Sequence, residues 1–165
     1  HQDLSYYPMT NRDVVTVLIN LDDATIENGC LTVIPGRHIG PPLDHTINGF
    51  FRGKVTEPVD AAAAVPLEGA AGDVTFMHCL TPHASVTNTS DQARRTLILS
   101  YRAGDCFPLY FDAKVVETEA HCRMVRGCPS ATARFTMTEF PVPIHERESA
   151  SLYELQEQTE RNEPV

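Results

Sequence analysis

The chain opens with two side chains that could bind a metal ion together. His1 carries an imidazole and Asp3 a carboxylate, and residues two apart on an extended strand point to the same face. A cation beside that face could take both groups as ligands. Two histidines and one carboxylate on one side of an ion, with the other positions open, is the arrangement of non-haem Fe(II) oxygenases. This pair alone is a weak signal, so the hypothesis needs a second histidine.

That histidine has to come from further along the chain. The remaining histidines are His38, His45, His78, His83, His121 and His145. Taken alone, any of them is an ordinary surface or core histidine, because histidines are found both exposed and buried in folded proteins. Residue types therefore leave the choice of the third ligand open.

Apolar residues with a period of two indicate that strands position these groups. Residues 13–21 are rich in β-branched side chains and carry little charge, as expected for a strand covered on both faces. Further strands are predicted at 30–34, 72–79, 83–88 and 94–101. Residues 40–57 predict a long loop, 61–66 fit either a helix or a strand, and only 149–161 have helical spacing. Many short strands with little helix indicate an all-β sandwich or jelly roll.

The composition fits one globular domain of a soluble protein. The chain has 165 residues, with 13 basic against 22 acidic side chains and a net charge of −9, which disfavours a nucleic-acid partner. No apolar run approaches the roughly 20 residues of a membrane span, and no signal peptide is visible. Five cysteines without a pairing pattern predict free thiols in a reducing compartment, hence a cytoplasmic location. Because the chain starts with His1 rather than Met, we expect that the N-terminal part of the domain is absent.

Several short motifs follow one another within residues 1–102. They are His1-Gln2-Asp3, Leu21-Asp22-Asp23, Glu27-Asn28-Gly29-Cys30-Leu31, Ile34-Pro35-Gly36-Arg37-His38, Gly72-Asp73, His83-Ala84-Ser85, Asn88-x-Ser90 and Arg94. Their order resembles the phytanoyl-CoA dioxygenase family of Fe(II)- and 2-oxoglutarate-dependent oxygenases. The combination is far more specific than any single motif, although Arg37 stands where the family usually has serine.

The resemblance implies the fold and the third ligand. The fold would be an all-β double-stranded β-helix, a cupin-like jelly roll, with long loops and a short C-terminal helix. Residues 1–110 would form the oxygenase domain and 111–165 a C-terminal extension. Ser85 and Arg94 follow His83 at the spacing that the family has, and His78 has neither partner. The resemblance thus implies Fe(II) ligation by His1, Asp3 and His83.

It also implies a place for 2-oxoglutarate. The distal carboxylate of this cosubstrate needs a planar double donor, which arginine supplies. Arg94 shares a strand face with Thr96, so both could bind one carboxylate. Arg95 is the alternative, because its face continues with apolar residues at 97, 99 and 101 that hydrophobicity would place in the core; the family spacing favours Arg94. Ser85 and Ile19 are further candidates for contact with the cosubstrate, and Ile19 is equally well explained as a core residue.

These expectations combine into a 2-oxoglutarate-dependent dioxygenase that uses O2, hydroxylates a small molecule and releases succinate and CO2. A halogenase of the same fold is disfavoured, because it would lack the carboxylate of Asp3. Two alternatives remain: a cupin-like jelly roll that binds a metal or a sugar without redox activity, and an inactive fragment of the oxygenase. We expect no membrane partner, and neither the substrate nor the oligomeric state can be predicted.

Overall fold

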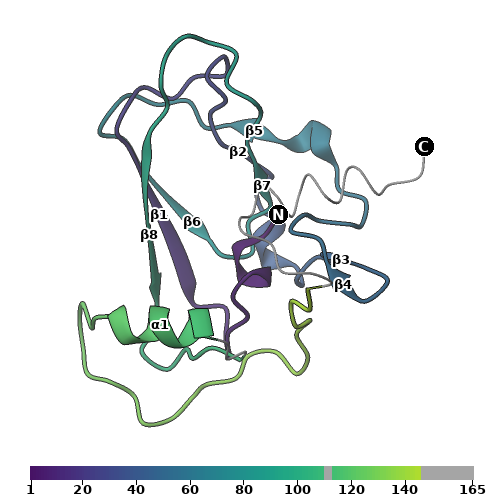
Figure 1. The fold of residues 1–165 in the computed structure, drawn as a ribbon, viewed down its shortest axis with the longest axis vertical. Helices are drawn as coiled ribbons and strands as arrows, with labels where there is room; N and C mark the ends of the chain where they lie inside the picture. Colours follow the sequence, from purple (N-terminus) through teal and green to yellow (C-terminus); the bar gives the residue numbers. More distant parts are fainter. Residues whose placement is uncertain (110–112, 146–165) are drawn as a thin grey trace.

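The computed structural model describes residues 1–109 and 113–145. Within them, two three-stranded sheets and one hairpin make up most of the regular structure (Figure 1), so the predicted all-β class is confirmed. The first sheet has the order β6-β1-β8, formed by Val74–His78, Val14–Asn20 and Thr96–Arg102. The second has the order β5-β2-β7, formed by Val65–Pro66, Thr32–Val33 and His83–Ala84.

The central strand of the first sheet is β1, whose uncharged, β-branched sequence suits a strand with neighbours on both sides. It pairs antiparallel with β6, where Val17 lies opposite Phe76, and with β8, where Thr16 lies opposite Ser100. Alternation along the strands gives the sheet two faces. We call the face with Thr16 the inner face, because Thr16 contacts Asp3, and the face with Val17 the outer face.

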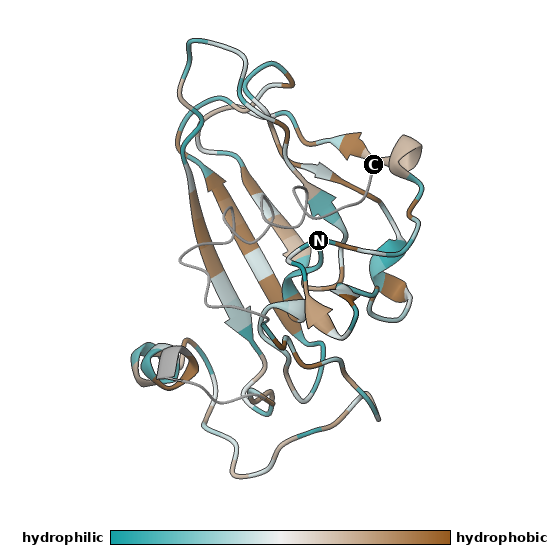
Figure 2. Cartoon of the chain, turned by 45° about the vertical axis from the view of Figure 1, so that its right-hand side comes forward, coloured by the Kyte–Doolittle hydropathy of each residue, from teal (hydrophilic) through white to brown (hydrophobic). Residues whose placement is uncertain are grey.

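The outer face is apolar but only partly covered. Val17 at its centre is buried, whereas Phe76 beside it is 73% exposed and Leu97 is 46% exposed. Figure 2 shows the alternation of brown and paler residues along these long strands. Exposure alone does not separate the two faces, because Ile98 on the inner face is 59% exposed; the inner face is distinguished by the contact of Asp3 with Thr16.

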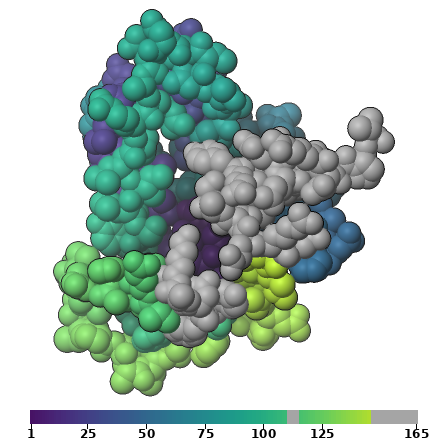
Figure 3. Space-filling model, viewed as in Figure 1, coloured from purple at the N-terminus to yellow at the C-terminus, as the bar shows by residue number. Residues whose placement is uncertain are grey.

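The N-terminal residues lie between the two sheets. Asp3 contacts β1 and His1 contacts β7, and the space-filling view shows the purple N-terminal atoms in the middle of the molecule (Figure 3). The main core lies directly behind them. It is formed by Leu4, Val14, Cys79, Leu80 and Cys106. The segment that would carry a metal is thus anchored by apolar burial.

The predicted loop 40–57 contains a hairpin. Thr46–Ile47 (β3) pairs with Phe50–Phe51 (β4), and the turn is Asn48-Gly49 with φ of 53° and 82°. Positive φ at both central residues is the pattern that Asn-Gly supplies in a two-residue hairpin. The hairpin could have been predicted from the sequence, because Asn48-Gly49 stands between two short β-prone segments.

Helical structure also differs from the expectation. Asp3–Ser5 (η1), Arg37–Ile39 (η2) and Ala61–Ala63 (η3) are single 3₁₀ turns, so segment 61–66 is a turn followed by β5. Ala113–His121 (α1) was not predicted, and the helix predicted at 149–161 lies outside the described residues. The strand predicted at 83–88 shortens to β7.

Residues 113–145 contact the first sheet and its flanking residues through ion pairs. Arg102 at the end of β8 makes a bidentate ion pair with Glu119 of α1, with N–O distances of 2.8 and 2.6 Å. Arg134 pairs with Asp105 and Asp13. The division into 1–110 and 111–165 stays a prediction, and these contacts show packing of residues 113–145 on the first segment.

All five cysteines are free, as predicted. Cys30, Cys79 and Cys106 are buried, whereas Cys122 and Cys128 are exposed. The reducing compartment inferred from them stays a prediction. In the part of the chain that the structure describes, every helix is too short or too polar to cross a bilayer.

Candidate metal centre

The first two candidate ligands flank a single extended residue. Gln2 has φ −116° and ψ 134°, and Asp3 then begins the 3₁₀ turn η1. The expectation that His1 and Asp3 lie on a regular strand is therefore wrong. Their side chains still meet because the residue between them is extended, which sends its own side chain the opposite way. The Nε2 atom of His1 lies 3.3 Å from Oδ1 of Asp3.

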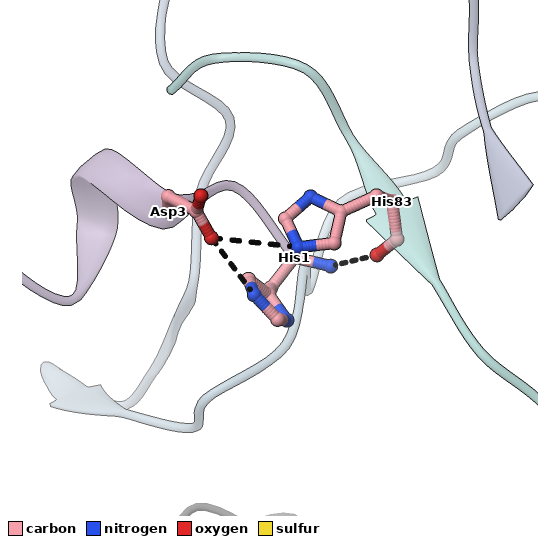
Figure 4. Close-up of side chains that lie close together, drawn as sticks. All are labelled: His1, Asp3 and His83. Atoms are coloured by element: carbon pink, nitrogen blue, oxygen red, sulfur yellow. Dashed lines mark hydrogen bonds and ion pairs between the residues drawn. The ribbon is translucent and has the colours of Figure 1, made fainter. Parts of the chain in front are cut away.

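His83 brings a second imidazole to the same carboxylate. Its Nε2 lies 3.4 Å from Oδ1 of Asp3, and Figure 4 shows both rings turned toward that oxygen. One ligand atom from each of the three residues lies within 4.8 Å of the others. All three side chains are mostly buried, with 18%, 14% and 9% exposed for His1, Asp3 and His83. Two imidazole nitrogens and one carboxylate oxygen are the donors of a facial triad, so these residues fit a non-haem iron ion.

Backbone hydrogen bonds hold the two imidazoles side by side. The amino nitrogen of His1 donates to the His83 carbonyl at 2.9 Å, and the His83 N–H donates to the His1 carbonyl at 3.0 Å. The Nδ1 atom of His83 lies 2.9 Å from the Thr81 carbonyl. A carbonyl can only accept, so this nitrogen carries the proton and Nε2 presents its lone pair to the site. Such a partner is typical of a metal-binding histidine.

A polar residue of β1 fixes the carboxylate. The Thr16 hydroxyl donates to Oδ2 of Asp3 at 2.5 Å, which leaves Oδ1 directed at the two imidazoles. Burial raises the pKa of Asp3, but hydrogen bonds from His1 and Thr16 and the charge of His83 outweigh it, so the pKa falls below 3.8. Burial and the nearby His1 lower the pKa of His83. The cluster therefore favours the ionised carboxylate of Asp3, which is the form that binds metal.

The competing histidines lie elsewhere. His78 pairs with Val15 in the register, which places it on the outer face, and its ring packs on His38 at 5.4 Å. His45 is buried behind the cluster and does not belong to the group that could hold a metal. His121 and His145 are exposed.

The predicted cosubstrate residues divide between the two faces. Thr96 lies opposite Asn20 and thus on the inner face, and Arg94 precedes it by two residues. The half-buried Arg94 donates from Nε to the Asn28 carbonyl at 3.2 Å, toward the second sheet. Among the described residues, no carboxylate lies within ion-pair distance of Arg94, which distinguishes it from Arg95. The exposed Arg95 makes a bidentate ion pair with Asp22.

Ile19 and Ser85, the two other residues predicted to contact the cosubstrate, lie in positions that favour this role less. Ile19 pairs with Val74 and Leu97, so it lies on the outer face, away from Thr16 and Asp3. Its contact with the cosubstrate stays a prediction that alternation along β1 does not favour. Ser85 follows β7 and is exposed, and its role stays a prediction.

Comparison with known proteins finds a family match over the part of the chain that contains the three candidate ligands. The sequence profile of the family described as phytanoyl-CoA dioxygenase (PhyH) matches residues 1–96. The chain is 36% identical over 151 residues to a probable alpha-ketoglutarate-dependent hypophosphite dioxygenase of Stutzerimonas stutzeri, covering 87% of this chain and 51% of that protein. It is 31% identical over 127 residues to the peroxisomal phytanoyl-CoA dioxygenase of Homo sapiens, covering 72% and 37%. The chain thus spans about half, or less, of the length of these curated relatives.

A solved structure supports the fold. The epimerase SnoN, determined in complex with Fe3+, alpha ketoglutarate and nogalamycin RO, is 25% identical, with a TM-score of 0.59 over 84% of this chain and 54% of that one. The predicted cupin-like jelly roll of 2-oxoglutarate oxygenases is therefore confirmed. Together with the profile match over more than half of the chain, this shows that the chain belongs to the phytanoyl-CoA dioxygenase family.

Proposed function

We propose that this chain forms the catalytic core of a non-haem Fe(II)- and 2-oxoglutarate-dependent dioxygenase that hydroxylates a small molecule and releases succinate and CO2. The observation that carries the proposal is the convergence of His1, Asp3 and His83 between the two sheets. A carboxylate placed between two imidazoles, with their donor atoms aimed at one point, is the donor set that such iron needs.

The ligand atoms would be Nε2 of His1, Oδ1 of Asp3 and Nε2 of His83. Bound iron, together with 2-oxoglutarate and O2, supplies the oxidising chemistry, and the protein supplies orientation and exclusion of water. Thr16 donates to the second carboxylate oxygen, Oδ2, so Oδ1 would be the oxygen left for the ion. The Thr81 carbonyl keeps the proton of His83 on Nδ1. These two contacts fix the orientation of the Asp3 carboxylate and the tautomer of His83 without a bound metal.

The distal carboxylate of 2-oxoglutarate would be bound by Arg94 with Thr96, and Ser85 would line the same region. Arg94 fits this role because it is half-buried, precedes Thr96 of the inner face by two residues, and makes no ion pair among the described residues. A guanidinium fork matches a carboxylate with two parallel hydrogen bonds.

The substrate class that we propose is a small molecule. The two relatives are named for hypophosphite and for phytanoyl-CoA, both of them small molecules. The negative charge of the chain disfavours nucleic acid. The free thiols agree with a cytoplasmic location, which we include in the proposal.

Anaerobic titration with Fe(II) and 2-oxoglutarate tests the proposal. We expect a weak visible charge-transfer band that saturates with the cosubstrate, because the keto acid chelates the iron. His83→Ala should lose this band, since it removes one of the three ligands. The matched control is His78→Ala, which should keep it, because His78 lies on the outer face. Absence of the band in the unaltered protein, or an unchanged band in His83→Ala, would contradict the iron assignment.

A further inference from the structure

We propose that Gln2 and His45 are positioning residues that set the geometry of the metal centre by fixing the backbone between its first two ligands. This inference rests on the proposed function and extends it to residues that touch neither metal nor cosubstrate. Gln2 is fully buried and His45 is 2% exposed. Both are polar side chains in a place where an apolar residue would pack without need of partners.

Gln2 connects three segments through its hydrogen bonds. Its side-chain Nε2 donates to the Leu80 carbonyl at 2.7 Å, and its Oε1 accepts from the Leu43 N–H at 2.7 Å. Its backbone N–H donates to Nε2 of His45 at 3.0 Å. The Leu80 contact lies in the turn that leads from β6 to His83. The residue between two ligands is thus held against the segment that delivers the third.

His45 completes this support with a defined tautomer. Its Nε2 accepts from Gln2, so the ring proton lies on Nδ1. That nitrogen is 2.9 Å from the Leu43 carbonyl and 3.1 Å from the Ser5 hydroxyl. The ring is also stacked on Phe51 of β4, with 6.1 Å between centroids and 19° between planes. The hairpin β3–β4 therefore holds the imidazole that holds Gln2.

The backbone conformation of Gln2 explains why its hydrogen bonds affect the positions of the two ligands beside it. Its extended conformation sends its side chain away from His1 and Asp3, which emerge together on the other side. Rotation or displacement of the Gln2 peptide would move the two ligands relative to each other. A facial triad tolerates little such movement, because metal sites depend on the supporting contacts behind their ligands.

Glutamine is required by the pattern of donors and acceptors. The Leu80 carbonyl needs a donor and the Leu43 N–H needs an acceptor, and a side-chain amide offers both. Gln2→Glu has nearly the same shape but loses the donor to Leu80. Asn11 provides a matched control. It is also fully buried, donates to the Asp105 and Arg134 carbonyls, and accepts from the Asp13 N–H. Asn11→Asp makes the same chemical change away from the cluster.

The test is binding of Co(II) alone, measured by calorimetry and by the visible absorption of the bound ion, with circular dichroism to verify folding. We expect Gln2→Glu to weaken Co(II) binding by about 10- to 100-fold and to alter the absorption bands. Asn11→Asp should lower the thermal midpoint while leaving Co(II) affinity and spectrum unchanged. Equal effects of the two variants on stability, with no effect of Gln2→Glu on Co(II), would overturn the inference.

A second pair of variants decides the matter if Gln2→Glu does not fold. His45→Phe keeps the ring beside Phe51 but removes the acceptor for the Gln2 N–H, and it should weaken Co(II) binding. His45→Gln restores an acceptor at about the position of Nε2 and should recover part of the loss. Wild-type affinity in His45→Phe would refute the positioning role alone. An unaltered protein that binds no Co(II) would refute the metal centre itself, and this inference with it.

Discussion

Asp3→Ala should abolish turnover. The carboxylate is the only anionic member of the cluster, and its Oδ1 lies between the two imidazole nitrogens. Without it, two neutral imidazoles would face the ion, and the facial triad would be incomplete. Succinate formation from 2-oxoglutarate in the presence of Fe(II) and O2 measures this without knowledge of the substrate. We expect no succinate above the metal-free background.

The fold should survive this change. Asp3 faces His1, His83 and Thr16, whereas the neighbouring Leu4 carries the burial in the core. The main structural loss is the acceptor for the Thr16 hydroxyl, which costs about 1–3 kcal/mol of the free energy of unfolding. Asp22→Ala is the matched control, because Asp22 is also a paired carboxylate but lies at Arg95. Full turnover in Asp3→Ala, or equal loss in Asp22→Ala, would contradict the assignment.

Arg94→Ala should raise the concentration of 2-oxoglutarate needed for half-maximal turnover by about 100-fold or more. The cosubstrate carboxylate would be left without its cation in a half-buried place, and removing one partner of a buried ion pair costs roughly 3–5 kcal/mol. Each ~1.4 kcal/mol is a factor of ten in affinity. Arg94→Lys should recover only part of the loss, because a lysine point charge lacks the second hydrogen bond.

Arg95→Ala separates this role from a general effect of charge. Arg95 is exposed and already paired with Asp22, so its loss should leave the 2-oxoglutarate dependence unchanged. A titration of succinate formation against 2-oxoglutarate compares the three variants directly. If Arg95→Ala raised the requirement and Arg94→Ala did not, the strand face assigned to the cosubstrate would be wrong.

The sequence predicted those parts of the fold that depend on local pattern. The strands at 13–21, 72–79 and 94–101 are found as β1, β6 and β8 with shifts of a few residues at their ends, because alternation of apolar residues directly reflects strand geometry. The motif order also implied that His83, rather than His78, would meet Asp3, and the structure brings His83 there. The role of the three residues as ligands remains a prediction.

Other features depended on contacts that no local pattern contains. Whether Arg94 or Arg95 shares the inner face depends on the side on which the N-terminal segment packs, so the apolar residues at 97 and 99 could not decide it. The face on which Ile19 lies depends on the same packing. Gln2 and His45 were missed because a buried polar residue is recognised by its partners, which lie far away in the sequence. For Thr16, a signal was available in the sequence, because a polar residue in the middle of an otherwise apolar strand segment needs a partner.

The strand order has a consequence for synthesis on the ribosome. β1 leaves the ribosome before both of its partners, β6 and β8, so Val15 waits for His78 and Val14 for Arg102. Translation at roughly 5–20 residues per second makes this wait last several seconds. Until β6 and then β8 are made, this β-branched, nearly uncharged strand lacks one or both neighbours, and such strands are prone to pair with other chains. The nascent chain should therefore depend on chaperone protection until β8 has left the exit tunnel.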